Sequence, residues 1–217
     1  MSLRYLTFDC YGTLIDWRKG IEENFKKFAK FKNSKGIDIF GEYVEIESKQ
    51  EQDYITYKQI LASSFLDLAH NLDLDPSQEV AQAFAISITS WPSFADTVPV
   101  LRSLGGKGLK RIILSNVDRE LLENTITLNK LEVDGYITAE DVKSYKPQRG
   151  HWLQLLKQYD LTKDEVVHVA GSIYHDIVPA AKLGFRTIWV NRYNESEPTE
   201  VKPTHSVRNL SEILNII

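Results

Sequence analysis

The sequence has very little cysteine and no long apolar run. Its 217 residues include one cysteine, Cys10, which excludes an internal disulfide framework and any zinc site built from several cysteines. No apolar stretch approaches the roughly 18 residues that cross a bilayer. The acidic Asp9 interrupts the N-terminus before the apolar segment of a secretory signal could form. We therefore expect a soluble, cytoplasmic protein with no membrane partner.

The chain also lacks an excess of positive charge. Lys and Arg total 26 against 30 Asp and Glu, which gives a formal net charge of −4. No basic run is interleaved with aromatic residues, as a nucleic-acid groove requires, so we expect no nucleic-acid partner. The 5 histidines show no spacing suited to a metal cluster. His168 lies within an apolar run, and we interpret it as a hydrogen-bonded core histidine.

Short apolar runs rich in β-branched and aromatic residues predict buried strands. These runs are residues 5–8, 111–114, 135–138, 166–170 and 187–190. Segments with helical spacing lie between them, and the one after Asp176 ends at Gly184, a helix C-cap signal. Strands that alternate with helices predict an α/β fold with a doubly wound parallel sheet, covered on both faces.

The segment from Trp17 to Pro92 interrupts this alternation. It carries three runs of helical spacing and no convincing strand, so we predict a helical insertion after the first strand. The predicted domains are an α/β core of residues 1–16 and 94–217 and an α-helical cap of residues 17–93. We interpret the acidic stretch 42–51 as a solvated helix face. An exposed aromatic face on the cap would favour a homodimer.

Polar residues gather at one edge of the predicted sheet. Ligands bind outside the carboxyl ends of parallel strands, so residues at this edge are the candidate site residues. In chain order they are Asp9, Thr13, Ser115, Asn116, Lys146, Ser172 and Asp176. Taken singly, each aspartate has an alternative role as a helix cap, and the lysine could lie on the surface.

Four motifs carry a resemblance. They are Asp9-Cys-Tyr-Gly-Thr-Leu14, Ser115-Asn116, Lys146-Pro147 and Ser172-Ile-Tyr-His-Asp176. With these motifs at strand ends and a helical insertion after the first strand, the chain resembles the haloacid dehalogenase (HAD) superfamily over essentially its whole length. The segment from Asp9 to Trp17 is particularly similar to type II (L-2-) haloacid dehalogenases.

The resemblance implies a hydrolase with a covalent ester intermediate. Asp9 would be the nucleophile, because a carboxylate can attack carbon or phosphorus and the resulting ester can be hydrolysed. Lys146 would keep neighbouring carboxylates ionised, and Asp176 would orient or activate the hydrolytic water. The residues implied to bind substrate are Tyr11, Thr13, Ser115, Asn116 and Ser172.

Two positions separate phosphatases of this superfamily from dehalogenases. Tyr11 stands where phosphatases place an Asp that protonates the departing alkoxide, and Gly171 stands where they place a magnesium ligand. A halide leaves without a proton, so both losses favour metal-independent conversion of a 2-haloacid and water to a 2-hydroxy acid and halide, with no cofactor required. The alternatives are a Mg²⁺-dependent phosphatase acting on a small phosphorylated metabolite and a binding protein that has lost turnover. A receiver domain fits less well because it lacks the insertion.

The dehalogenase pattern is incomplete. No arginine lies between Arg18 and Arg102, so we expect the cap to lack the arginine that holds the substrate carboxylate in those enzymes. Lys49 or Lys58 would be a weaker substitute, because an ammonium cannot make a bidentate contact. The other departures from the motifs are Ile173 and Trp152. The sequence thus predicts a retained hydrolytic centre with an altered shell around it, and leaves the physiological substrate open.

Overall fold

The computed structural model describes residues 3–32, 36–51 and 53–217. Six strands within these residues form one sheet, in the order β3-β2-β1-β4-β5-β6. The strands are β1 (Tyr5–Phe8), β2 (Lys110–Ser115), β3 (Gly135–Thr138), β4 (Val166–Ala170), β5 (Arg186–Val190) and β6 (His205–Val207). Every pair of neighbours is parallel, which confirms the predicted parallel sheet.

The predicted strands match the observed ones closely, apart from one omission. β1, β3 and β4 have the predicted bounds, while β2 and β5 each begin one residue earlier and β2 ends one residue later. β6 was not predicted; it spans three residues, two of them exposed. A strand this short and polar leaves no apolar run to recognise.

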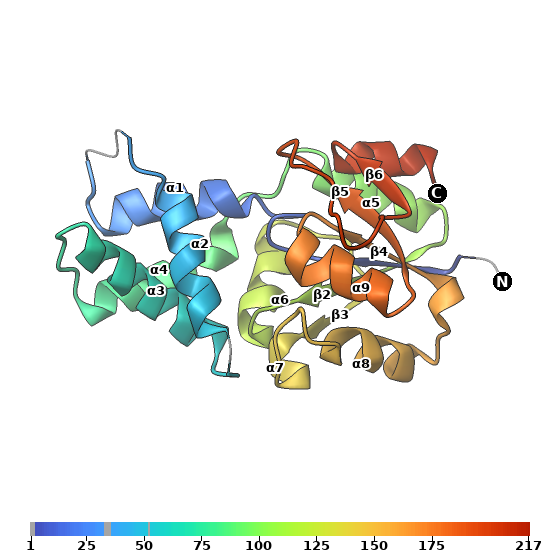
Figure 1. Ribbon diagram of the computed structural model, residues 1–217, viewed down its shortest axis with the longest axis horizontal. Helices are drawn as coiled ribbons and strands as arrows, with labels where there is room; N and C mark the ends of the chain where they lie inside the picture. The colour runs from blue at the N-terminus through green and yellow to red at the C-terminus, as the bar shows by residue number, and fades with distance from the viewer. Residues whose placement is uncertain (1–2, 33–35, 52) are drawn as a thin grey trace.

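Helices cover both faces of the sheet (Figure 1). They are α5 (Thr97–Gly106), α6 (Arg119–Leu128), α7 (Ala139–Val142), α8 (Gly150–Tyr159) and α9 (Val178–Lys182), with the 3₁₀ helices η2 (Lys163–Glu165) and η4 (Leu210–Asn215) and the π turn η3 (Ile173–Ile177). Successive β2 residues alternate between the faces: Ile112 packs with Trp152 of α8, whereas Ile113 belongs to the cluster on the other face. After α9 the chain turns at Gly184, with φ of +88° and an amide that donates to the Ala181 carbonyl at 2.9 Å, as its C-cap prediction requires.

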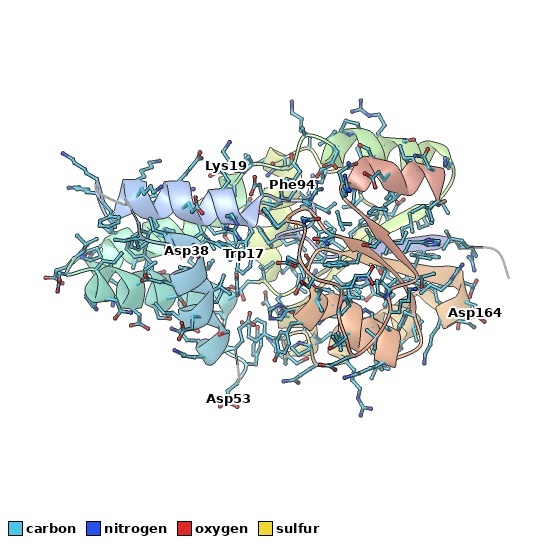
Figure 2. All side chains as sticks on the ribbon, turned by 45° about the horizontal axis from the view of Figure 1, so that its top comes forward. Trp17, Lys19, Asp38, Asp53, Phe94 and Asp164 are labelled. Carbon is cyan, nitrogen blue, oxygen red and sulfur yellow. The ribbon has the colours of Figure 1, made fainter. Side chains whose placement is uncertain are left out.

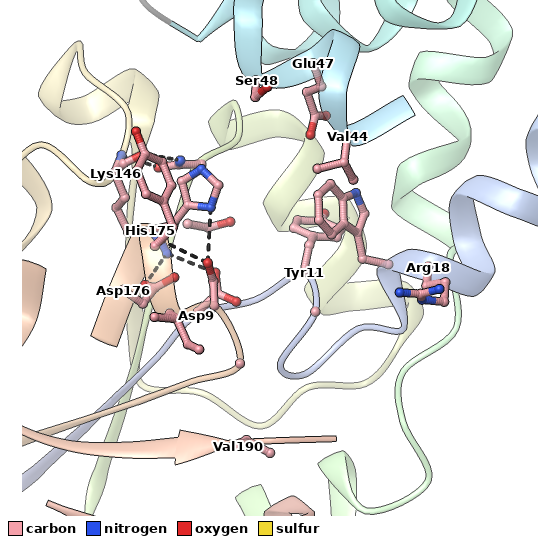
Figure 3. Close-up of a pocket in the computed structure, with 18 of the residues that line it drawn as sticks. Asp9, Tyr11, Arg18, Val44, Glu47, Ser48, Lys146, His175, Asp176 and Val190 are labelled. Carbon is pink, nitrogen blue, oxygen red and sulfur yellow. Dashed lines mark hydrogen bonds and ion pairs between the residues drawn. The ribbon is translucent and has the colours of Figure 1, made fainter. Parts of the chain in front are cut away.

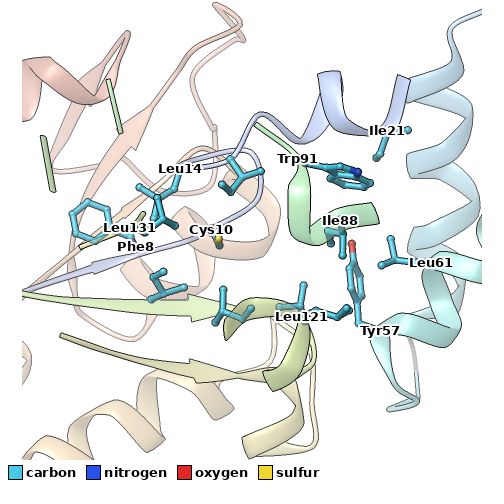
Figure 4. Packing of buried hydrophobic residues seen from close by; sticks show 14 of the residues in the cluster. Phe8, Cys10, Leu14, Ile21, Tyr57, Leu61, Ile88, Trp91, Leu121 and Leu131 are labelled. Carbon is cyan, nitrogen blue, oxygen red and sulfur yellow. The ribbon is translucent and has the colours of Figure 1, made fainter. Parts of the chain in front are cut away.

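Four helices follow β1 and pack together beyond one end of the sheet (Figure 1). They are α1 (Trp17–Phe28), α2 (Ile39–Gln50), α3 (Tyr57–Asn71) and α4 (Gln78–Ser87), followed by the 3₁₀ turn η1 (Ile88–Ser90). We call α1–α4 the helical layer. Figure 4 shows its buried side chains, such as Ile21 and Leu61, continuing through Trp91 toward Cys10 beside the sheet. None of the described helices is both long and apolar enough to span a membrane.

Two chain segments, which follow β1 and η1, connect the helical layer to the rest of the chain, and hydrogen bonds link them to each other. The Asp16 amide donates to the Pro92 carbonyl at 2.8 Å, and the Phe94 amide donates to the Leu14 carbonyl at 3.1 Å. Figure 2 labels Trp17 and Phe94, which lie where the chain passes from one part to the other. Because these connections extend from the end of β1, the helical layer faces the sheet edge at which Asp9 lies.

Candidate active site

Asp9 directly follows β1 and is fixed by two hydrogen bonds. Its Oδ1 accepts from Nζ of Lys146 at 2.9 Å, and its Oδ2 accepts from the Thr13 hydroxyl at 2.7 Å. The Thr13 hydroxyl in turn accepts from the Gly171 amide at 2.8 Å. Asp9 is 7% exposed and lines a cavity between the sheet edge and the helical layer. The loop after β1 therefore presents a single oriented carboxylate to the cavity.

Lys146 joins Asp9 to Asp176. Its Nζ donates to Oδ1 of Asp176 at 2.7 Å and to the Leu114 carbonyl at 2.9 Å, so all three of its hydrogens have acceptors. Oδ1 of Asp176 also contacts Nε2 of His168 at 2.9 Å. Among the described residues, Oδ2 of Asp176 has no hydrogen-bond partner. The structure thus brings together all three predicted catalytic residues (Figure 3).

Burial and charge give the two carboxyls different acidities. Burial raises the pKa of Asp9, and the Lys146 ammonium and the Thr13 hydroxyl only partly offset it. Burial also raises the pKa of Asp176, but Lys146 and His168 outweigh burial and hold that pKa well below its usual range. Burial lowers the pKa of Lys146, whereas the two carboxylates raise it above the ordinary lysine value. Lys146 is therefore charged at neutral pH, and Asp176 is the more firmly ionised carboxylate.

The Ser115-Asn116 pair plays two different parts. Both polar atoms of the Asn116 side chain engage the Lys146 backbone: Nδ2 donates to its carbonyl at 3.0 Å, and Oδ1 accepts from its amide at 2.7 Å. Asn116 thus positions Lys146, and its side chain makes no hydrogen bond with Asp9. Ser115 is buried and lines the cavity, and within the described part of the chain its hydroxyl has no partner. The Ser115 hydroxyl is therefore a buried polar group beside the cavity without a hydrogen bond to a described residue.

Tyr11 and Ser172 also line the cavity, although their hydroxyls are already engaged. The Tyr11 hydroxyl shares a 2.7 Å hydrogen bond with the Thr125 hydroxyl of α6. The Ser172 hydroxyl accepts from the His175 amide at 3.1 Å and caps the turn that carries Asp176. Tyr11 therefore offers the cavity its ring, and Ser172 holds the turn in place.

An arginine lines the cavity from the helical layer, so the expected absence of one is wrong. Arg18 lies in the first turn of α1, and its guanidinium carbon lies 4.4 Å from the Phe40 ring centroid and 4.9 Å from that of Tyr193. Arg18 itself lies within the predicted cap, at the second residue of α1. Lys49 instead pairs with Glu45 on the exposed side of α2.

One face of α2 forms the cavity wall opposite Asp9. Its lining residues recur at helical spacing, as Phe40, Val44, Glu47 and, just beyond the helix, Glu51. The interpretation of residues 42–51 as a solvated face is therefore wrong for Glu47, which is 4% exposed. The same spacing is present in the sequence, but only the fold shows which face of α2 turns toward the sheet.

The described residues contain no group of three or more His, Cys, Asp and Glu side chains arranged to hold a metal ion. Gly171, where phosphatases of the superfamily place a metal ligand, has no room for a side chain. A Cβ added there would lie 2.8 Å from the Gly12 carbonyl oxygen. The Lys146 ammonium also occupies the position between the Asp9 and Asp176 carboxylates. These residues do not fit a magnesium site of the phosphatase kind.

Known proteins resemble this chain in sequence and in fold. The (S)-2-haloacid dehalogenase of Pseudomonas fluorescens is 28% identical over 99% of this chain and 96% of its own length. A pyrimidine 5′-nucleotidase of Escherichia coli is 22% identical over 100% of this chain and 99% of its own. The structure of the L-2-haloacid dehalogenase of Xanthobacter autotrophicus with chloropropionic acid covalently bound shares the fold, with a TM-score of 0.86 at 17% identity, covering 99% of this chain and 98% of that one. The family model for haloacid dehalogenase-like hydrolases matches residues 3–184, and the chain belongs to that family of hydrolases.

Proposed function

We propose that this hydrolase converts a 2-haloacid and water to a 2-hydroxy acid and halide, through an ester on Asp9. The observation that carries the proposal is the hydrogen-bonded set formed by Asp9, Lys146 and Asp176 at the floor of the cavity. We also propose that the chain divides as the sequence predicts, into a core of residues 1–16 and 94–217 and a cap of residues 17–93 that closes over the floor.

In the first step a carboxylate oxygen of Asp9 attacks the carbon that bears the halogen. A carbon–oxygen bond forms while the carbon–halogen bond breaks, and the halide leaves with the bonding electrons. Thr13 and Lys146 each hold one oxygen of Asp9, which restricts the carboxylate to one orientation. A halide is a weak base and leaves unprotonated, so this step needs no acid at the position of Tyr11.

In the second step water attacks the carbonyl carbon of the Asp9 ester. The unpartnered Oδ2 of Asp176 accepts a hydrogen bond from this water and orients it, and the Lys146 ammonium stabilises negative charge that develops on the ester oxygen. Collapse of the intermediate releases the 2-hydroxy acid and restores the carboxylate of Asp9. One proton of the water passes to the departing alkoxide oxygen, and the other passes to solvent.

Arg18 is the group that we assign to the substrate carboxylate. Its Nε is buried without a hydrogen-bond partner, and no carboxylate of a described residue lies within 4.0 Å of the guanidinium. A guanidinium can bind a carboxylate through two parallel hydrogen bonds. The Phe40 and Tyr193 rings hold the guanidinium at the cavity wall, 4.4 Å and 4.9 Å from their centroids.

The phosphatase alternative has less support in the chemistry of the site. A phosphate dianion that approaches Asp9 needs a cation to offset repulsion. The site offers Lys146, but Asp9 and Asp176 already surround that ammonium. Because one relative is a nucleotidase, phosphate ester hydrolysis is the second candidate reaction. A direct assay distinguishes it from dehalogenation.

The test is parallel turnover by the wild-type enzyme and Asp9→Asn. Each enantiomer of 2-chloropropionate is followed by halide release, and p-nitrophenyl phosphate by phosphate release, with EDTA or with Mg²⁺. We expect halide release that depends on Asp9 and is insensitive to EDTA. A single turnover in ¹⁸O-labelled water with enzyme in excess should leave the product unlabelled and place ¹⁸O in Asp9. Phosphate release that requires both Asp9 and Mg²⁺, without halide release, would replace the proposal with the phosphatase.

A further inference from the structure

The cavity is larger than a short haloacid requires. Its volume is about 470 Å³, whereas a water molecule in the liquid occupies about 30 Å³. An acid of two or three carbons bound between Asp9 and Arg18 would leave much of this space to solvent. The face of α2 that carries Val44, Glu47 and Ser48 lines part of this space (Figure 3).

Glu47 is the polar group on this wall that most needs a partner. The side chain is almost fully buried, and its Oε1 accepts a hydrogen bond from the Tyr57 hydroxyl at 2.8 Å. Its other oxygen makes no hydrogen bond within the residues that the structure describes. Figure 3 shows the side chain extending from α2 into the cavity. An acceptor oxygen of a side chain that lines the cavity is open to a donor that a ligand brings.

The charges around Glu47 favour a cation as that donor. No Lys, Arg or His of the described chain lies within 4.0 Å of its carboxyl group, and Glu51, one helical turn further along, lines the same wall. Burial, followed by repulsion from Glu51, raises the pKa of Glu47 well above the ordinary glutamate value. A buried carboxyl group without a partner charge favours its neutral form, and a cation beside it favours the ionised form. A cationic ligand would supply the missing charge, while His175, 3.3 Å from Glu51, holds the neighbouring carboxyl.

We propose that Glu47 selects substrates that carry an amino group at the end distant from the reacting carbon. The inference rests on the proposed function and names the class of 2-haloacid: the carboxylate lies at Arg18, the halogen-bearing carbon at Asp9, and a side-chain ammonium at Glu47. The apolar side chains Trp17, Phe40 and Val44 line the space for the methylene groups between these ends.

The experiment compares matched pairs that differ only in the amino group. Halide release is measured for 2-bromo-6-aminohexanoate and 2-bromohexanoate, and binding of 6-aminohexanoate and hexanoate by calorimetry. Homologues with shorter and longer methylene chains are included, so that the series covers different distances between the reacting carbon and the amino group. The variants are Glu47→Gln, which keeps the acceptor for Tyr57, and Glu45→Gln, a control on the exposed side of the same helix. We expect the wild type to favour the amino compounds by about tenfold or more, as a charged hydrogen bond provides.

Glu47→Gln should abolish this preference, and Glu45→Gln should retain it. Equal treatment of both members of each pair by the wild type overturns the inference, whether or not Glu47→Gln folds. The inference is also overturned if a folded Glu47→Gln variant still prefers the amino compounds. Halide release without preference leaves the proposed function intact and removes the inference. Selective binding of the amino compounds without halide release would support the role of Glu47 in binding and would contradict the proposed function.

Discussion

Nζ of Lys146 donates a hydrogen bond to Oδ1 of Asp9 at 2.9 Å, and both groups are buried. A third buried group, Asp176, shares the same ammonium. Removing a single partner from such a set leaves charge without compensation in a medium of low dielectric constant. The ionisation of the nucleophile and the stability of the fold therefore depend on the same lysine.

Lys146→Met should shift the pH dependence of halide release to higher pH. Asp9 must be ionised to attack, and an opposite charge in contact lowers a carboxyl pKa by roughly 1–3 units, so losing Lys146 should raise the acid limb of kcat/KM by a similar amount. The free energy of unfolding should also fall, by about 3–5 kcal/mol. The measurements are a pH–rate profile and urea unfolding. Lys157→Met, an exposed substitution on α8, is the control. An unchanged acid limb would show that Lys146 does not set the ionisation of Asp9.

Arg18→Gln should weaken binding of the haloacid more than it slows the chemistry. Loss of a charged hydrogen bond to the substrate carboxylate predicts a KM for 2-chloropropionate that is about 10–100-fold higher, with a smaller change in kcat. Arg18→Lys should give a KM between those of the wild type and Arg18→Gln, because lysine retains the charge but not the bidentate geometry. Steady-state kinetics provide the test, with the exposed Arg149→Gln as control. A fall in kcat at constant KM would place the substrate carboxylate elsewhere.

Asp134 should make the fold sensitive to acid. Burial raises its pKa, but the Arg111 side chain and amide, together with Lys110, outweigh burial and lower it to about 2. A folded pKa below the unfolded value of about 3.9 stabilises the fold above pH 4, and this contribution is lost as the pH falls toward 2. Asp134→Asn should therefore cost roughly 2 kcal/mol at pH 7 and much less near pH 2.

The measurement for Asp134 is the free energy of unfolding in urea at several pH values between 2 and 7. Asp75→Asn, at a fully exposed side chain, is the matched control and should follow the wild type. The account of the Arg111 contact would have to be abandoned if the Asp134→Asn difference did not shrink as the pH falls.

Asp118 should stabilise the contact between the helical layer and the sheet. Its carboxylate accepts from the Tyr57 amide at 3.0 Å and from the Lys58 amide at 2.8 Å, and so caps α3 from the start of α6. Asp118→Ala should lower the free energy of unfolding by about 1–2 kcal/mol, as removal of a helix cap does. Asp118→Asn keeps one acceptor oxygen and should lose about half as much. Hydrogen exchange of the two amides checks the assignment, since a purely distant effect would leave their protection unchanged.

The predicted fold came from local patterns, which is why most of it agrees with the structure. The runs of apolar, β-branched and aromatic residues at β1 and β4 are four and five residues long, so composition and length identify them without tertiary information. Local patterns do not identify α5, whose segment contains Pro99 and two terminal glycines, or β6, which is short and polar. Packing and strand pairing with neighbouring elements stabilise a helix or strand of this kind, and a local pattern does not report those contacts.

The parallel sheet, and the arrival of Asp9, Lys146 and Asp176 at its edge, could be predicted from local sequence patterns, because strand ends in such a sheet lie side by side. Which side chains meet at this edge depends on how the chain folds. It engages Asn116 with the Lys146 backbone, brings His168 to Asp176 from within β4, and turns Arg18 and Glu47 of the helical layer toward the cavity. The direction of a helix face depends on packing between segments distant in the chain, and no local pattern encodes it.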